Sequence, residues 1–259
     1  MAATLSSASH GQTLVITWSN PEFRNALGPE IYAGAIEALN AAERSPDIRS
    51  VVFTGEGSVF CAGGNLQRLK GNRTQPPEVQ AQSIEAMHDW IESIRHFPKP
   101  VIAAVEGAAA GAGFSLALAC DFVVAASDAS FVMAYGRVGL SPDGGASYHL
   151  TRSLPRQLVT EILLCGESIG SQRLYDFGLV NQVTAPGTAL DKALELAGRL
   201  NAMAPNVHAA NKELINRAQD STLNAQLAEE RDKFVRNLHH ANAGIGIEAF
   251  LSKHPPKFV

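Results

Sequence analysis

Two segments rich in glycine and alanine, each placed after a short apolar run, carry backbone groups that could act on a substrate. Residues 60–66 (Phe-Cys-Ala-Gly-Gly-Asn-Leu) follow the apolar run 51–54, and residues 106–114 follow the run 101–105. Backbone N–H groups at turns and in the first turn of a helix lack a partner in the chain and can bind a negatively charged oxygen. Two such groups converging on one carbonyl oxygen would form an oxyanion hole. The same small residues are also compatible with nothing more than tight packing of a helix on a strand.

An acidic residue, Asp143, stands in a third segment, Ser-Pro-Asp-Gly-Gly at residues 141–145. It could serve as a general acid or base, or simply as a turn residue and helix N-cap. A serine hydrolase is a further alternative, because residues 113–117 resemble a degenerate nucleophile elbow around Ser115, and His149 with Asp143 could complete a triad. Ser115 lies inside an apolar stretch that predicts a helix, whereas the elbow requires a sharp exposed turn, so this alternative is disfavoured.

Other classes of site have little support in the sequence. Neither glycine-rich segment reads G-x-G-x-x-G and no P-loop occurs. The eight histidines show no metal-ligand spacing, so we expect no metal site, and a net charge of −4 without a basic patch argues against nucleic acid. Three widely spaced cysteines form no disulfide framework and fit a reducing cytoplasm.

The sequence also argues against a location of the protein in a membrane. The first twelve residues contain neither the basic nor the apolar region of a signal peptide. The longest apolar stretch, 101–126, is interrupted by Glu106, Asp121 and a run of glycine and alanine, and indicates a buried strand, a buried helix and a second strand. We therefore expect a cytoplasmic protein with no membrane partner.

The elements that must position these segments alternate early in the chain and become helical later. Alternation and short apolar runs predict strands, whereas i, i+3, i+4 spacing predicts helices. This order predicts an α/β core over residues 1–190 and a C-terminal helical region over 191–259. The predicted strands are 13–18, 51–54, 101–105, 121–126, 131–133 and 179–183, and the main predicted helices are 32–39, 84–94, 111–120 and 190–197.

Five segments, in order and spread over nearly the whole chain, resemble the enoyl-CoA hydratase/isomerase (crotonase) superfamily. They are Asn-Pro-Glu-Phe-Arg-Asn-Ala-Leu at 20–27, Phe-Cys-Ala-Gly-Gly-Asn-Leu at 60–66, the central segment 103–121, Gly-Leu-Ser-Pro-Asp-Gly-Gly at 139–145, and Phe-Leu-Ser-Lys at 250–253. Within the superfamily the chain looks most similar to phenylacetate-pathway isomerases and oxepin-CoA-forming-like members.

The resemblance implies a fold, a substrate class and an assembly. The fold would be a crotonase (ClpP-like) spiral of ββα repeats with a C-terminal helical trimerisation region. The protein would be a homotrimer or a dimer of trimers that binds an acyl-CoA. No separate cofactor is implied, because coenzyme A is part of the substrate thioester.

The resemblance also implies roles for individual residues. Gly64 and Ala112 would donate the two oxyanion N–H groups. The coenzyme A path would be lined by Ala62, Gly63, Asn65 and Leu66, with Arg24, Ala26 and Leu27 opposite. Phe250 and Lys253 belong to the C-terminal motif, and Lys253 is expected to reach a phosphate of coenzyme A, in its own or a neighbouring subunit.

The sequence departs from the hydratase pattern at both catalytic glutamates. By the motif match these positions fall on Ser115 and Tyr135, which become substrate-binding candidates, and an asparagine, Asn65, replaces the usual aspartate of the first loop. Hydration needs a pair of acid/base groups, one for water and one for the α-carbon. Asp143 remains as a lone acid/base, which favours an isomerase. A hydratase with atypical water-activating residues and a non-catalytic acyl-CoA-binding protein remain alternatives. Phe114, Phe131, Met133 and Tyr135 are expected to make the pocket apolar.

Overall fold

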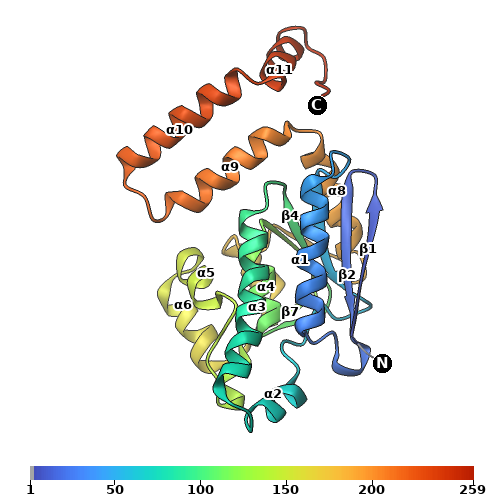
Figure 1. Ribbon diagram of the computed structural model, residues 1–259, viewed down its shortest axis with the longest axis vertical. Coiled ribbons are helices and arrows are strands. Elements are labelled where there is room, and N and C mark those ends of the chain that lie inside the picture. The colour runs from blue at the N-terminus through green and yellow to red at the C-terminus, as the bar shows by residue number, and fades with distance from the viewer. Residues whose placement is uncertain (1–2) are drawn as a thin grey trace.

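Two β-sheets form the frame of the protein in the computed structural model, which describes residues 3–259 (Figure 1). In the larger sheet only β1 and β2 pair antiparallel, and every other neighbour is parallel. Its order is β1 (Thr4–His10), β2 (Thr13–Ser19), β3 (Ser50–Gly55), β4 (Val101–Val105), β6 (Phe122–Ala126) and β9 (Gln182–Thr184). The smaller sheet has the order β5 (Ala108–Ala110), β7 (Ser130–Val132) and β8 (Ser168–Gly170).

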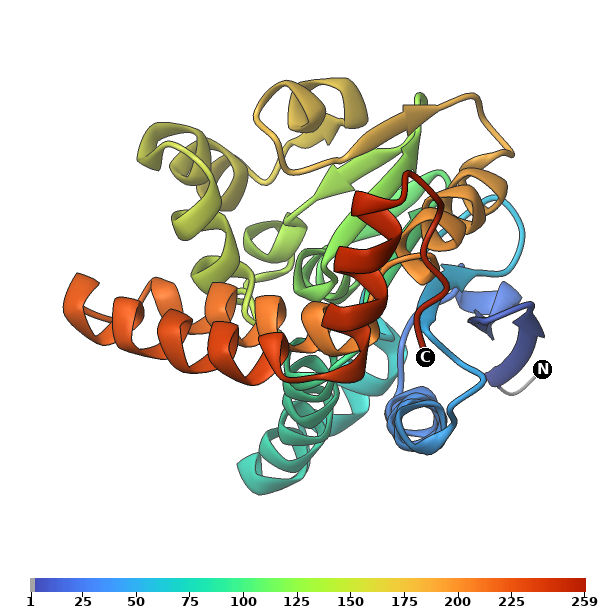
Figure 2. The ribbon, with the colours of Figure 1, turned by 90° about the horizontal axis from the view of Figure 1, so that it is seen from above.

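Helices cover both faces of the larger sheet, which explains why β3 and β4 are buried at every position. Helices α1 (Pro29–Arg44) and α3 (Pro77–His96) pack on the face that holds Trp18 and Phe53. Helix α8 (Ala189–Asn201) packs on the face that holds Val52 and Ile102, with small alanines against the sheet. Seen from above in Figure 2, α1 and α8 lie on opposite sides of the strands.

Shorter helices connect the strands and carry the loops of interest. They are η1 (Pro21–Phe23), α2 (Leu66–Asn72), α4 (Ala112–Ala119), η2 (Ala134–Val138), α5 (Ala146–Ser153), α6 (Arg156–Thr160), η3 (Glu161–Cys165) and α7 (Ser171–Asp176). Within the described residues, no helix combines the length and the apolar character needed to cross a membrane.

The predicted order of strands and helices is confirmed, and three strands were missed. β1 is serine-rich and exposed, so it shows no apolar face, and β8 has three residues only. β5 consists of three alanines inside the segment interpreted as a turn. These strands form by pairing with a neighbour, which local composition does not report.

The predicted domain boundary at residue 190 falls at the start of helix α8, and this helix completes the core. The helices α9 (Pro205–Ala218), α10 (Leu223–Leu238) and α11 (Ala241–Leu251) stand at one end of the molecule, beyond the sheet (Figure 1). The Lys212 ammonium of α9 donates to Asp121 Oδ2 at 2.6 Å and ties this group to the core. We propose that the division between core and C-terminal region lies after α8.

Candidate active site

The two glycine-rich loops lie side by side because they pair like strands. Cys61 N–H donates to the Ala108 carbonyl (2.9 Å), and Ala110 N–H donates to the Cys61 carbonyl (2.8 Å). Gly63 has a φ of +99°, and a Cβ at this position would lie 3.0 Å from the Ala110 carbonyl oxygen. Only glycine adopts this conformation at so close an approach without strain. The pairing therefore brings Gly64 and the start of α4 to one place.

Gly64 and Ala112 both line a cavity of about 550 Å³. Ala112 is the first residue of α4, where no helical carbonyl lies one turn earlier to accept its N–H. A Cβ on Gly63, the residue before Gly64, would lie 3.8 Å from the Ala112 nitrogen. The two predicted donors thus share one cavity, as an oxyanion hole requires.

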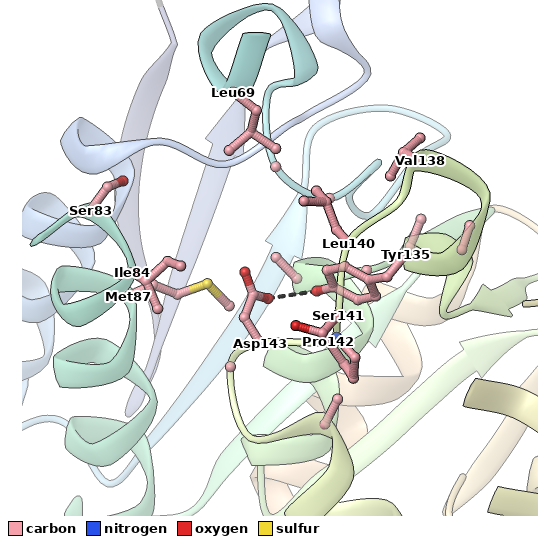
Figure 3. Close-up of a pocket in the computed structure, with 18 of the residues that line it drawn as sticks. Leu69, Ser83, Ile84, Met87, Tyr135, Val138, Leu140, Ser141, Pro142 and Asp143 are labelled. Atoms are coloured by element: carbon pink, nitrogen blue, oxygen red, sulfur yellow. Dashed lines mark hydrogen bonds between the residues drawn. The ribbon is translucent and has the colours of Figure 1, made fainter. Parts of the chain in front are cut away.

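Asp143 enters the same cavity from the segment between η2 and α5. Its Oδ1 accepts a hydrogen bond from the Tyr135 hydroxyl at 2.5 Å (Figure 3). Burial and the nearby Asp143 carboxylate raise the pKa of Tyr135 well above its usual value. Tyr135 therefore stays protonated and remains a hydrogen-bond donor to the carboxylate.

Ser115 holds the backbone of the Asp143 segment in place. This residue is fully buried, and its hydroxyl donates to the Asp143 carbonyl at 2.9 Å and lies 3.3 Å from the Gly111 carbonyl. Next to it, Gly144 has a φ of +59°, and a Cβ there would meet Met87 Cε at 2.5 Å. Ser115 is thus placed as a support of the segment and does not line the cavity.

The buried serine also decides against the hydrolase alternative. Its hydroxyl is directed to backbone carbonyls, and His149 lines a different cavity. The expected apolar wall needs a correction as well. Phe114, Phe131 and Met133 are fully buried core residues and do not line the cavity, and the rings of Phe114 on α4 and Phe131 on β7 pack against each other.

The apolar wall comes instead from α2, α3 and the loop before Asp143. Met87 and Ile84 project from α3 towards the Asp143 carboxylate in Figure 3. Helix α3 carries no motif, so nothing in the sequence pointed to Ile84 and Met87 as lining residues, although both belong to the apolar stripe that predicted this helix. The wall residues are Leu69, Ile84, Met87, Val138 and Leu140, and polar lining comes from Tyr32, Arg68, Gln80, Ser83 and His88.

Asp143 is the only carboxylate among the described residues that line this cavity. The predicted residues that line it with Asp143 are Ala62, Gly63, Gly64, Leu66, Ala112 and Tyr135. No group of three or more His, Cys, Asp or Glu side chains suited to a metal ion occurs within residues 3–259.

Several predicted binding residues shape the first loop and do not line the cavity. The Arg24 carbonyl accepts from Ala62 N–H (3.0 Å), and Leu27 N–H donates to the Gly63 carbonyl (2.8 Å), while Ala26 between them is buried. The Asn65 side chain caps α2 by accepting from Gln67 and Arg68 N–H. An asparagine oxygen thus fills the capping role that an aspartate would fill.

The C-terminal residues of the prediction lie far from this cavity within one chain. Phe250 is 84% exposed and Lys253 follows the end of α11. Figure 1 places α11 at the opposite end of the molecule from α2. Neither residue can join the site of its own subunit in this arrangement.

His149, behind the Asp143 segment, provides a prediction about stability and pH. Burial and the positive charges of Arg95 and Arg152 lower its pKa to about 4. The unfolded chain therefore binds an extra proton between about pH 6.5 and pH 4, and stability falls as the pH falls through this window, by at most about 3 kcal/mol.

Urea unfolding at several pH values should show this loss in the wild type and not in His149→Gln. A His10→Gln variant, exposed in β1, should keep the wild-type slope, and an unchanged slope in His149→Gln would contradict the assignment.

Comparison with known proteins gives consistent matches over nearly the whole length of the chain. The sequence profile described as enoyl-CoA hydratase/isomerase matches residues 9–259. The chain is 35% identical over 246 residues to 1,2-epoxyphenylacetyl-CoA isomerase of Escherichia coli, covering 95% of this chain and 94% of that protein. It is 34% identical to 2,3-dehydroadipyl-CoA hydratase of the same organism, covering 95% of both chains. A crystal structure of an enoyl-CoA hydratase from Polaromonas sp. JS666 is 69% identical and superposes with a TM-score of 0.98, over 98% of this chain and 99% of the other.

Proposed function

Since the chain belongs to the enoyl-CoA hydratase/isomerase family, we propose that it is an acyl-CoA isomerase that moves a proton along a thioester enolate. The predicted α/β crotonase fold is confirmed by the family match and by the likeness to solved enoyl-CoA hydratases. The proposal rests on Asp143, the one carboxylate that the described residues contribute to the cavity that Gly64 and Ala112 also line.

The proposed reaction needs one base and two N–H donors. Asp143 takes a proton from the α-carbon of a 3-enoyl thioester, and the electrons pass to the thioester oxygen, which accepts hydrogen bonds from Gly64 and Ala112. The protonated Asp143 then returns the proton to the γ-carbon, which leaves a conjugated 2-enoyl thioester. Enolate stabilisation by such donors acts where charge develops in the transition state.

Tyr135 has a positioning role in this proposal. Its hydroxyl holds one carboxylate oxygen of Asp143, so the other oxygen is left for the substrate proton. Tyr135→Phe should lower kcat by about 10–100-fold with little change in KM, because a hydrogen bond to a charged group is removed and no binding contact is lost. Steady-state kinetics on a 3-enoyl-CoA measure both constants. A rise in KM at unchanged kcat would assign Tyr135 to binding and not to positioning.

The coenzyme A moiety is proposed to follow the first loop. Ala62, Gly63 and Leu66 line the cavity, while the Arg24 and Leu27 backbones and the Asn65 side chain hold the loop in shape, with Ala26 buried between Arg24 and Leu27. Coenzyme A enters as part of the substrate, and no separate cofactor is proposed.

The C-terminal helices support a proposed trimer, or dimer of trimers. A run of large apolar side chains lies exposed on α9 to α11, and such patches mark protein contacts. In that assembly Phe250 and Lys253 would belong to the site of a neighbouring subunit. The exposed residues are Val207, Ile215, Leu223, Leu227, Phe234, Val235, Leu238, Ile247, Phe250 and Leu251.

Hydration is the second candidate, favoured by the hydratase names of several relatives. It would require Asp143 to activate water as well as to supply the α-proton, since no second carboxylate lines the cavity among the described residues. The third candidate function is acyl-CoA binding without catalytic activity.

One experiment separates the three. The wild-type protein is incubated with a 3-enoyl-CoA and, separately, with crotonyl-CoA, and the products are identified by NMR. The proposal expects the conjugated isomer from the first and little 3-hydroxyacyl-CoA from the second. Faster hydration than isomerisation would assign a hydratase, and no product from either would favour a binding protein.

A further inference from the structure

A cationic side chain without an acidic partner lines the acyl cavity. The Arg68 guanidinium donates from Nη1 to Ser83 Oγ at 2.9 Å. Its Nε is buried and has no hydrogen-bond partner. Among the residues that the structure describes, no carboxylate oxygen lies within 4 Å of Arg68. Buried donors are almost always paired in native proteins, so this one calls for an acceptor.

Tyr32 adds a second donor at the same place. It is buried in α1, lines the cavity and interacts with the Arg68 guanidinium. Burial raises the pKa of Tyr32 to about 12, against the opposing effect of Arg68. The phenol therefore stays protonated, and its hydroxyl can donate beside the guanidinium.

Asp143, the proposed general base, does not neutralise the charge of Arg68. Asp143 Oδ1 accepts the hydrogen bond from Tyr135, and no ion pair within 4 Å joins Asp143 to Arg68 among the described residues. The side chains of Leu69, Ile84 and Met87 provide the apolar part of the same cavity. The cavity therefore has apolar walls. The thioester donors and Asp143 lie in one part of it, and the positive charge of Arg68, which has no acidic partner among the described residues, lies in another.

We propose that the acyl group ends in a carboxylate, which Arg68 binds with the help of Tyr32. The substrate class is then the monothioester of an unsaturated dicarboxylic acid. A guanidinium matches a carboxylate in both charge and geometry, and the pair gains strength where water is excluded. This inference rests on the proposed acyl-CoA site, but it does not depend on which reaction follows binding.

Binding of ligands that cannot react tests the inference apart from the catalytic proposal. Isothermal titration calorimetry would compare saturated dicarboxylic monothioesters, from succinyl-CoA to suberyl-CoA, with plain acyl-CoAs of the same chain lengths. We expect at least one dicarboxylic ligand to bind about tenfold or more tightly than its plain partner, as a hydrogen bond to a charged group implies. Equal or weaker binding of every dicarboxylic ligand would overturn the proposal.

Variants of Arg68 locate the effect. Arg68→Met should abolish the preference and leave the affinity for plain acyl-CoAs nearly unchanged, while Arg68→Lys should retain part of it. Lys70→Met removes an exposed cation from the same helix and should keep the full preference. A uniform loss of affinity for all acyl-CoAs in Arg68→Met would assign Arg68 to coenzyme A and overturn the proposal. An equal preference for an acyl-CoA with a neutral terminal hydroxyl would contradict the carboxylate.

Discussion

Replacing Asp143 with asparagine should lower kcat for isomerisation by about 10²–10⁴-fold, the usual contribution of a general acid or base. The amide keeps the size and the hydrogen-bonding capacity of the side chain but cannot accept the α-proton. Because Asp143 is proposed to act on the α-carbon of the substrate and not to hold coenzyme A, the affinity for a saturated acyl-CoA should be nearly unchanged. Steady-state kinetics and calorimetric binding measure the two quantities.

A matched control uses an acidic residue outside the cavity. Asp47 is exposed after α1, so Asp47→Asn should retain wild-type turnover. Full turnover in Asp143→Asn would remove this residue from the chemistry. Equal losses of turnover and of binding would indicate a damaged fold, which circular dichroism detects.

Adding a methyl group to Gly113 should have the second-largest effect, because α4 packs directly on the first loop. A Cβ on Gly113 would lie 2.5 Å from Cys61 Cβ and 3.0 Å from the Cys61 carbonyl oxygen. The helix start must then move away from the loop, and Ala112 N–H moves with it. A misplacement of about 1 Å costs roughly 100-fold in rate, and overpacking costs about 1–3 kcal/mol of stability.

The chain offers a close control for Gly113→Ala. Gly198 also lies in a helix, α8, but has open space where its Cβ would be. Gly198→Ala should leave kcat unchanged and stabilise the protein by up to about 1 kcal/mol, the difference in helix propensity. Wild-type kcat in Gly113→Ala would show that the contact between α4 and the first loop does not set the rate.

The parts of the site that the sequence predicts are those with local signals. Gly63, Gly64 and Ala112 stand in glycine- and alanine-rich segments after buried strands. An apolar run followed by such a segment indicates both a strand and a turn. Asp143 follows a proline and precedes two glycines in an apolar neighbourhood. The strands 51–54 and 101–105 were predicted from short apolar runs, and both are buried at every position because helices cover both faces of their sheet.

The residues that sequence missed depend on how elements pack. Tyr32, Arg68 and Met87 belong to three helices separated along the chain, and only tertiary packing brings them to one cavity. Phe114 and Phe131 were expected in the pocket because aromatic residues near a motif are equally compatible with core and wall. Their ring contact at 5.0 Å places them in the core.

Deuterium exchange at the α-carbon is the most direct test of Asp143 as the base that forms the enolate, because it needs enolate formation and no later step. A saturated acyl-CoA is incubated in D₂O with wild-type protein or with Asp143→Asn, and the α-protons are followed by NMR. The account predicts exchange that is catalysed by the wild type and lost in the variant, with binding retained in both. Exchange that persists in Asp143→Asn, or a wild type that binds the ligand without any exchange, would contradict it.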